Sequence, residues 1–186
     1  MVSGKTSDRE RKRLLKLSEV SMILDNYEEL FSDFDPRPYP QRGLSDDFLL
    51  EAKKAVRDKE FGVAELNLML PKKSREENIE IIIKKRLKDH YKKHYNLLKK
   101  EQDRIIWKGL SFTVLGIIFM FLAVYIMFAL NDETFIVSFM IVLLEPAGWF
   151  LFWEGLGLIV FESKEKRSDL KFYESISKAK ISFTGY

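Results

Sequence analysis

The chain has 186 residues, a formal net charge of +3 and no cysteine. The lack of cysteine excludes disulfides, thiolate metal sites and cysteine nucleophiles. Most of the charge lies outside residues 110–161, and the remainder of roughly 130 residues is enough for one small soluble domain.

Residues 1–34 are predicted to hold an amphipathic N-terminal helix. Apolar residues recur there at spacings of three and four, which is typical of one helical face: Leu17, Val20, Leu24, Tyr27 and Phe31. Such a stripe has to pack against the domain, a sister subunit or the membrane surface. The acidic residues around it, Glu28 and Glu29 among them, disfavour the membrane surface.

Residues 35–44 are predicted to be a Pro-rich linker, because Pro36, Pro38 and Pro40 alternate and favour an extended backbone. Residues 45–74, together with 179–186, are predicted to form a small cytoplasmic α/β domain. It would contain a helix from Ser45 to about Lys59 and a strand over residues 64–70. The C-terminal residues alternate in the same way, so we expect the two strands to pair.

A helical stalk is predicted for residues 75–109. Ser74 and Glu77 match a capping box, and no proline or glycine follows until Gly109. His90 and His94 are one helical turn apart, so both can reach one metal ion. The segment His-Tyr-Lys-Lys-His lacks the glutamate that follows the first histidine in zinc peptidases and has lysines before the second, and no third ligand is evident, so we expect no metal and no cofactor.

Two apolar runs, residues 110–130 and 135–161, dominate the second half of the chain. A bilayer core is crossed by about 20 apolar residues of helix, and the first run contains no charge. The runs are separated by residues 131–134 and therefore predict a transmembrane hairpin at 110–161, followed by a cytoplasmic helix at 162–178. The expected fold is a mostly α integral membrane protein with a small α/β domain and a long stalk.

Basic residues flank both runs, whereas the connecting loop has no Lys or Arg. They are Lys92, Lys93, Lys99, Lys100, Arg104 and Lys108 before the first run, and Lys164, Lys166, Arg167 and Lys171 after the second. Lys and Arg next to membrane spans stay cytoplasmic. We therefore expect a multi-pass protein of the cell membrane with both termini in the cytoplasm. Acidic residues interleave these cations, which disfavours nucleic acid as a partner.

Glu145 and Glu154 are ionisable residues inside the second run. Carboxylates in hydrocarbon are costly and usually face a bundle interior or water. Three interpretations stay open: an ion path lined by Glu145 from several subunits, a structural contact between helices, or a helix break at Glu145-Pro146. Glu145-Pro146 resembles the acidic pore motif of the mitochondrial calcium uniporter, although the Trp-Asp half of that motif is absent.

Small and aromatic residues in the second run are typical of helix packing. Gly148 and Gly155 are seven residues apart and share one face, with Pro146, Trp149 and Trp153 nearby. Small residues let helices approach closely in lipid. This pattern predicts a tight hairpin or a homo-oligomer.

Several short features together resemble a group of uncharacterised prokaryotic two-span membrane proteins. The features are Phe34-Asp35-Pro36 with Pro40, Leu44-Ser45-Asp46, a strand ending in Leu70-Pro71, Gly148-Trp149 with Trp153, and Tyr173 before a final strand. The resemblance covers most of the chain from about Phe34 onward. It implies the hairpin-plus-domain layout and carries no activity.

The chain shows no glycine-rich phosphate loop, no nucleophile elbow and no paired catalytic carboxylates in a soluble pocket. We therefore expect no enzyme, but a membrane scaffold or accessory subunit that self-associates in the lipid bilayer. The alternative is a small homo-oligomeric cation channel with Glu145 on its path. A metal-dependent enzyme at His90 and His94 is a third hypothesis.

Overall fold

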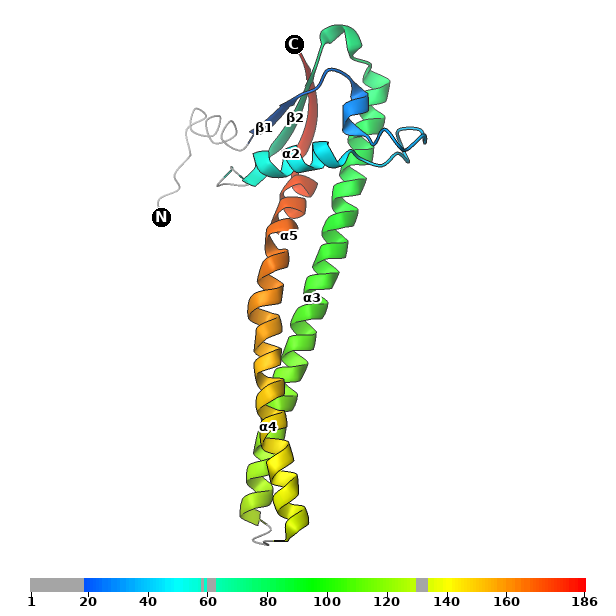
Figure 1. Cartoon of the computed structure of the whole chain (residues 1–186). Coiled ribbons are helices and arrows are strands. Elements are labelled where there is room, and N and C mark those ends of the chain that lie inside the picture. Colours follow the sequence, from blue (N-terminus) through cyan, green and yellow to red (C-terminus); the bar gives the residue numbers. More distant parts are fainter. Residues whose placement is uncertain (1–18, 58, 60–62, 130–133) are drawn as a thin grey trace, which may run out of the picture. The chain divides into compact units, whose positions relative to one another are not determined.

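A computed structural model describes residues 19–57, 59, 63–129 and 134–186 (Figure 1). The chain forms two compact units. We name them the α/β unit, Met1–Asn96 with Leu170–Tyr186, and the hairpin unit, Leu97–Asp169.

The α/β unit is built on a three-stranded parallel sheet in the order β1-β2-β3. The strands are β1 (Glu19–Ile23), β2 (Glu65–Leu70) and β3 (Lys180–Gly185). The predicted pairing of the second and third strands is confirmed, with Leu66 opposite Ile181. β1 was not predicted, and it joins the other edge of β2 with Val20 opposite Leu66.

The prediction of an N-terminal helix over residues 1–34 is wrong for the described part of that range. Glu19–Ile23 is a strand and Tyr27–Leu30 is a short 3-10 helix, η1, whose first turn is capped by the Asn26 side chain. Residues 1–18 lie outside the described residues. Val20, Leu24, Tyr27 and Phe31 are buried as expected. However, Val20, Met22 and Leu24 also alternate, and hydrogen bonding to β2 decides in favour of the strand.

Helices cover one face of the sheet. They are α2 (Asp46–Arg57), the first part of α3 (Glu77–Ala129) and the last part of α5 (Ser163–Lys178). Leu66, Leu68 and Leu70 of β2 are fully buried against them, since alternate strand residues point to one side. The helices contribute these buried side chains to the core: Phe48, Ala52, Val56, Ile83, Leu87, Tyr91, Phe172 and Ile176.

The prediction of an extended linker over residues 35–44 is also wrong. Phe31 and Leu44 form an antiparallel bridge, and the Ser32 amide donates to the Gly43 carbonyl at 2.9 Å. The chain between them closes into a loop on the α/β unit. Alternating prolines allow extended backbone, but they do not prevent the turns that the polar contacts of this loop stabilise.

A buried carboxylate joins η1 to the start of α3. Glu80 is 3% exposed and receives two hydrogen bonds from Arg75, at 2.8 and 3.1 Å. The Tyr27 hydroxyl donates to Glu80 at 3.3 Å and accepts from the Glu76 amide at 2.9 Å. The helix begins at Glu77, after a 3-10 turn η2 (Lys72–Ser74), two residues later than the predicted start of the stalk at Arg75.

The hairpin unit consists of the remainder of α3, then α4 (Phe135–Gly157), a π-helical turn η3 (Leu158–Glu162) and the start of α5. Its two helices are long and apolar enough to cross a membrane. α4 continues through Pro146, so the helix break considered at Glu145-Pro146 is not formed. Proline removes one backbone hydrogen bond, but the flanking turns keep the helix intact.

Candidate functional site in the helical hairpin

Four glycines form the contact between α3 and α4. A Cβ placed on Gly155 would lie 2.5 Å from the Gly109 carbonyl oxygen, and one placed on Gly116 would lie 2.6 Å from the Gly148 carbonyl oxygen. Cβ atoms do not approach backbone this closely, so only glycine permits the contact. The two antiparallel helices are therefore packed backbone against backbone at two levels, as small residues allow in apolar surroundings.

The structure places the predicted Gly148 and Gly155 in this contact, and it adds Gly109 and Gly116 on α3. Sequence reasoning missed the second pair although it carries the same signal: Gly109 and Gly116 are also seven residues apart. Thr113 completes the contact, because its hydroxyl donates to the Gly109 carbonyl at 2.9 Å and lies against Gly155.

The large residues predicted to pack in α4 lie on the exterior of the hairpin. Trp149 and Trp153 are 54% and 55% exposed, with ring centroids 5.6 Å apart, and Pro146 is exposed as well. The glycines thus lie between the two helices, and these large side chains lie on the exterior of the hairpin.

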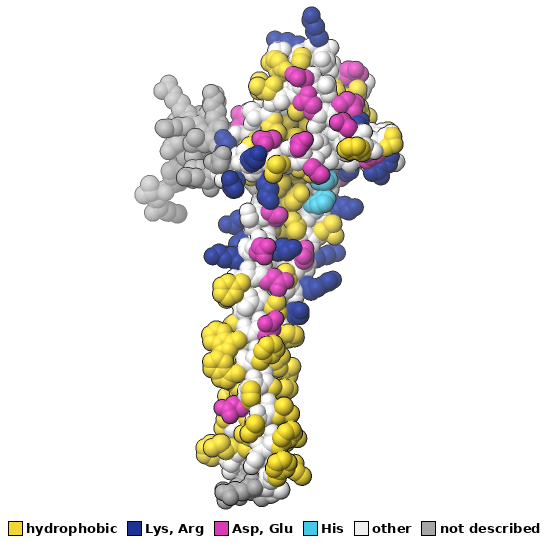
Figure 2. All heavy atoms as spheres, viewed as in Figure 1, with side chains coloured by type: hydrophobic (Ala, Val, Ile, Leu, Met, Phe, Trp, Pro, Cys, Tyr) yellow, Lys and Arg dark blue, Asp and Glu magenta, His cyan; other side chains and the backbone are white. Residues whose placement is uncertain are grey.

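Glu145 and Glu154 are both exposed on this exterior, and Figure 2 shows an acidic side chain among the hydrophobic ones. At 3.6 residues per turn, Glu145 lies about 60° from Gly148 around the helix and Glu154 about 120° on the other side. Neither forms a hydrogen bond or ion pair within the part of the chain that the structure describes. A single hairpin therefore leaves both carboxylates facing its surroundings.

Polar contacts join α3 to the start of α5 beyond the apolar segment. Gln102 donates to the buried Ser163 hydroxyl at 3.3 Å, and Lys166 pairs with Glu101 at 3.0 Å. Between Gly157 and Ser163 the helix widens into η3, where the Ser163 amide donates to the Leu158 carbonyl. Such π-helical turns recur at functional positions in helices.

His90 and His94 lie in the α/β unit, in an aromatic cluster with Tyr91 and Tyr173. The imidazole centroids are 4.2 Å apart with planes tilted by 30°, and His94 stacks on Tyr173. A metal ion lies in the plane of each imidazole that binds it, so two nearly stacked rings do not share one. Within the described residues no group of three or more His, Asp or Glu side chains is arranged to hold a metal.

Burial lowers the pKa of both histidines, which favours the neutral imidazoles near pH 7. Burial lowers the pKa of His90 to about 4, and the nearby His94, Arg86 and Lys93 act in the same direction. The His90 Nε2 atom and the Tyr91 hydroxyl are buried and have no hydrogen-bond partner among the described residues. The arrangement is that of packed aromatic side chains.

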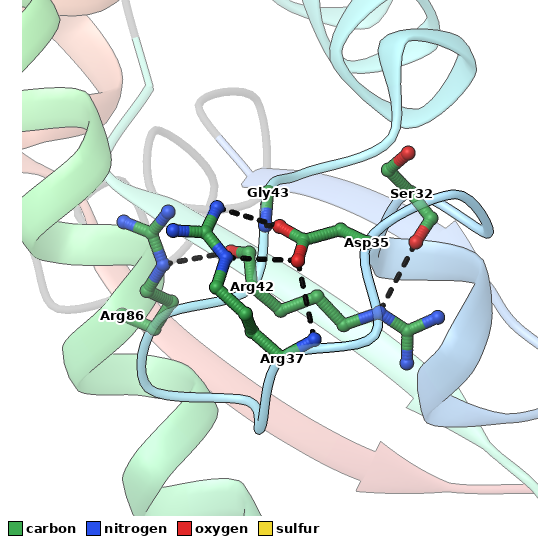
Figure 3. Close-up of polar contacts among 6 residues, drawn as sticks. All are labelled: Ser32, Asp35, Arg37, Arg42, Gly43 and Arg86. Carbon is green, nitrogen blue, oxygen red and sulfur yellow. Dashed lines mark hydrogen bonds and ion pairs between the residues drawn. The ribbon is translucent and has the colours of Figure 1, made fainter.

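The loop between Phe31 and Leu44 is held by polar contacts, shown in Figure 3. Asp35 accepts from the Gly43 amide at 2.6 Å and from two nitrogens of the Arg37 guanidinium at 2.7 and 2.8 Å, and these contacts lower its pKa. Arg42 donates to the Ser32 carbonyl at 3.1 Å. The loop is therefore fixed, and yet Phe34 within it is 98% exposed.

Two further contacts attach this loop to the unit. The Arg86 guanidinium of α3 donates to the Arg42 carbonyl at 2.9 Å. The Tyr39 hydroxyl donates to Glu28 at 2.6 Å, which raises the pKa of Tyr39 to about 12, and its ring packs 5.1 Å from Phe31. Sequence reasoning missed this loop because the contacts that attach it to the unit involve Arg86 and Glu28, which lie outside the proline-rich segment.

Comparisons with protein-family models, with curated proteins and with solved structures find no match to this chain. The resemblance to prokaryotic two-span membrane proteins stays a prediction.

Proposed function

We propose that this protein is a non-enzymatic membrane scaffold or accessory subunit that assembles into homo-oligomers through its hairpin. Insertion is supported by the hairpin exterior, where large apolar side chains are exposed, including Phe121 at 72%, Phe128 at 77% and Phe150 at 67%. Apolar area of this extent is stable in lipid and aggregates in water. The basic residues on both sides of the hairpin support cytoplasmic termini.

The main observation that supports self-association is the exposed carboxylate of Glu145. It is exposed on α4 within an apolar stretch and has no partner in its own hairpin among the described residues. A carboxyl group in hydrocarbon is stabilised by contact with a neighbouring helix or with water. A second copy of the hairpin supplies such a neighbour, with Glu145 at the contact between subunits.

The fixed loop of the α/β unit supports the scaffold role. Phe34 is almost fully exposed on a loop whose backbone is already held by Asp35 and Arg42. A rigid loop loses little conformational entropy on binding, and exposed aromatic residues are frequent anchors of protein interfaces. The loop therefore suits recognition of a protein partner.

The oligomeric state of the full chain in detergent tests this proposal. Native mass spectrometry should find a dimer or larger oligomer for the wild type. Glu145→Leu should raise the dissociation constant roughly 5- to 30-fold, since interhelical polar contacts contribute about 1–2 kcal/mol each. Glu145→Gln should retain assembly, because an amide still forms hydrogen bonds.

Val142→Ala is the matched control, since Val142 is 69% exposed one turn from Glu145 and carries no polar group. It should leave the dissociation constant within about twofold. A monomeric wild type, or equal assembly of wild type and Glu145→Leu, would contradict the proposal.

A small cation channel is the second candidate, because the same outward Glu145 would line a path if several copies surrounded an axis. Purified protein in liposomes should then pass cations, and Glu145→Gln should abolish the flux while the oligomer persists. An oligomer without flux favours the scaffold.

A further inference from the structure

Three cations form a stripe on α3 immediately before its apolar segment. Lys100, Arg104 and Lys108 follow one another at spacings of four residues, and all three are exposed. Residues four apart on a helix lie on neighbouring turns of one face. We call these three residues the basic stripe.

The basic stripe faces away from the helix contact. Relative to Gly109, its members lie about 100–180° around α3, while the buried Ile105 lies on the contact side. Trp107, 68% exposed, lies on the same outward side, and the Lys108 ammonium is 5.6 Å from the centre of the Phe112 ring. Positive charge and apolar surface are therefore adjacent.

The acidic groups nearby do not neutralise this stripe. Glu101 is already paired with Lys166, which leaves Asp103 as the other acid of α3 between residues 99 and 108. The facing end of α5 carries exposed Lys164 and Arg167 beside Glu165, and η3 ends at Glu162. None of the stripe's three cations forms an ion pair within the described part of the chain.

We propose that the basic stripe binds the phosphate headgroup of an anionic phospholipid, with the acyl chains against Trp107 and the apolar residues that follow. The inference rests on the proposed insertion of the hairpin in a bilayer. A soluble phosphate or a nucleic acid would contact only the cationic side chains, whereas an anionic lipid contacts both these side chains and the adjoining apolar surface.

Lipid retention by the full chain tests this site. The protein is reconstituted into nanodiscs of phosphatidylcholine and phosphatidylglycerol at about 4:1, and native mass spectrometry measures the lipids that stay bound. The wild type should retain phosphatidylglycerol and phosphatidylcholine in a ratio at least about fivefold above the bulk ratio, since each cation near the headgroups adds attraction. The triple change Lys100→Gln, Arg104→Gln and Lys108→Gln should return the ratio to the bulk value.

A second triple change on the same helix, Lys85→Gln, Lys88→Gln and Lys92→Gln, is the matched control. It removes the same charge from exposed positions that precede the stripe by eight residues or more, and it should leave retention unchanged. Equal retention by the stripe variant, or equal loss in the control, would overturn the headgroup site. Failure of the wild type to enter nanodiscs would instead overturn the proposed membrane function.

Discussion

Gly155→Leu should separate the two helices of the hairpin. The Cβ alone would lie 2.3 Å from the Thr113 hydroxyl and 2.5 Å from the Gly109 carbonyl, and non-bonded heavy atoms need about 3.5 Å. The backbones must therefore move apart by more than about 1 Å, and the remaining leucine atoms require more. Overpacking of this kind costs about 1–3 kcal/mol or more.

Spin labels can measure this separation, because the chain has no native cysteine and two introduced cysteines would be labelled specifically. Cysteines at Leu110 and Phe150, both exposed, carry the labels on α3 and α4. The mean interspin distance should lengthen and its distribution broaden in Gly155→Leu. Gly157→Leu is the control, since a Cβ there meets nothing within 4 Å, and its distances should equal those of the wild type. Equal distances in Gly155→Leu would show that the glycine contact is not formed.

Glu80→Ala should destabilise the α/β unit by about 2–3 kcal/mol. The change leaves the Arg75 guanidinium and the Tyr27 hydroxyl without the carboxylate that joins them, and Arg75 is only 34% exposed. Hydrogen exchange of β2 in the full chain reports local opening, and its rate should rise roughly 30- to 150-fold. Glu77→Ala, on the exposed side of the same turn, should change the rate little.

The stabilisation by Glu80 should also depend on pH. Burial raises the pKa of Glu80, but the hydrogen bonds and charge of Arg75 outweigh it, so the folded pKa lies below the ordinary 4.5. The contribution is therefore complete above about 4.5 and is lost as the pH falls through the lower, folded value. The difference in exchange rate between wild type and Glu80→Ala should shrink from pH 6 to pH 3.5. A constant difference would show that the ion pair is not what stabilises the unit.

The long helices were predictable because an apolar run without a polar face indicates a helix whatever it packs against. In lipid, an apolar run such as the one at residues 110–130 can satisfy its backbone hydrogen bonds only as a helix, so composition alone indicates the element. The strand at residues 65–70 was predictable for a similar reason, since Leu66, Leu68 and Leu70 alternate with polar or less buried residues.

The N-terminal strand and the loop after it were not predictable, because both depend on distant partners. Val20 and Leu24 fit a helical stripe and an alternating strand equally well, and only the free edge of β2 selects the strand. In the loop, Asp35 binds the Gly43 amide and Arg86 of α3 binds the Arg42 carbonyl. Local composition reveals the prolines but not the hydrogen bonds that close the loop.

Only the α4 half of the glycine contact was predicted, because the other half depends on residues distant along the chain. The spacing of Gly148 and Gly155 indicates a packing face, but their partners Gly109 and Gly116 follow only from the register of α3 against α4. The outward direction of Glu145 likewise depends on which face the glycines occupy.

Cysteine accessibility in intact bacterial cells tests the central claim, that a membrane surrounds the hairpin and both termini are cytoplasmic. The two labelling positions are introduced by Thr134→Cys and Glu51→Cys. Thr134 lies at the start of α4, and Glu51 lies on the exposed side of α2. An impermeant maleimide should label position 134 in intact cells and position 51 only after permeabilisation. Labelling of position 51 in intact cells, protection of position 134, or recovery of the protein in the soluble fraction would contradict this account.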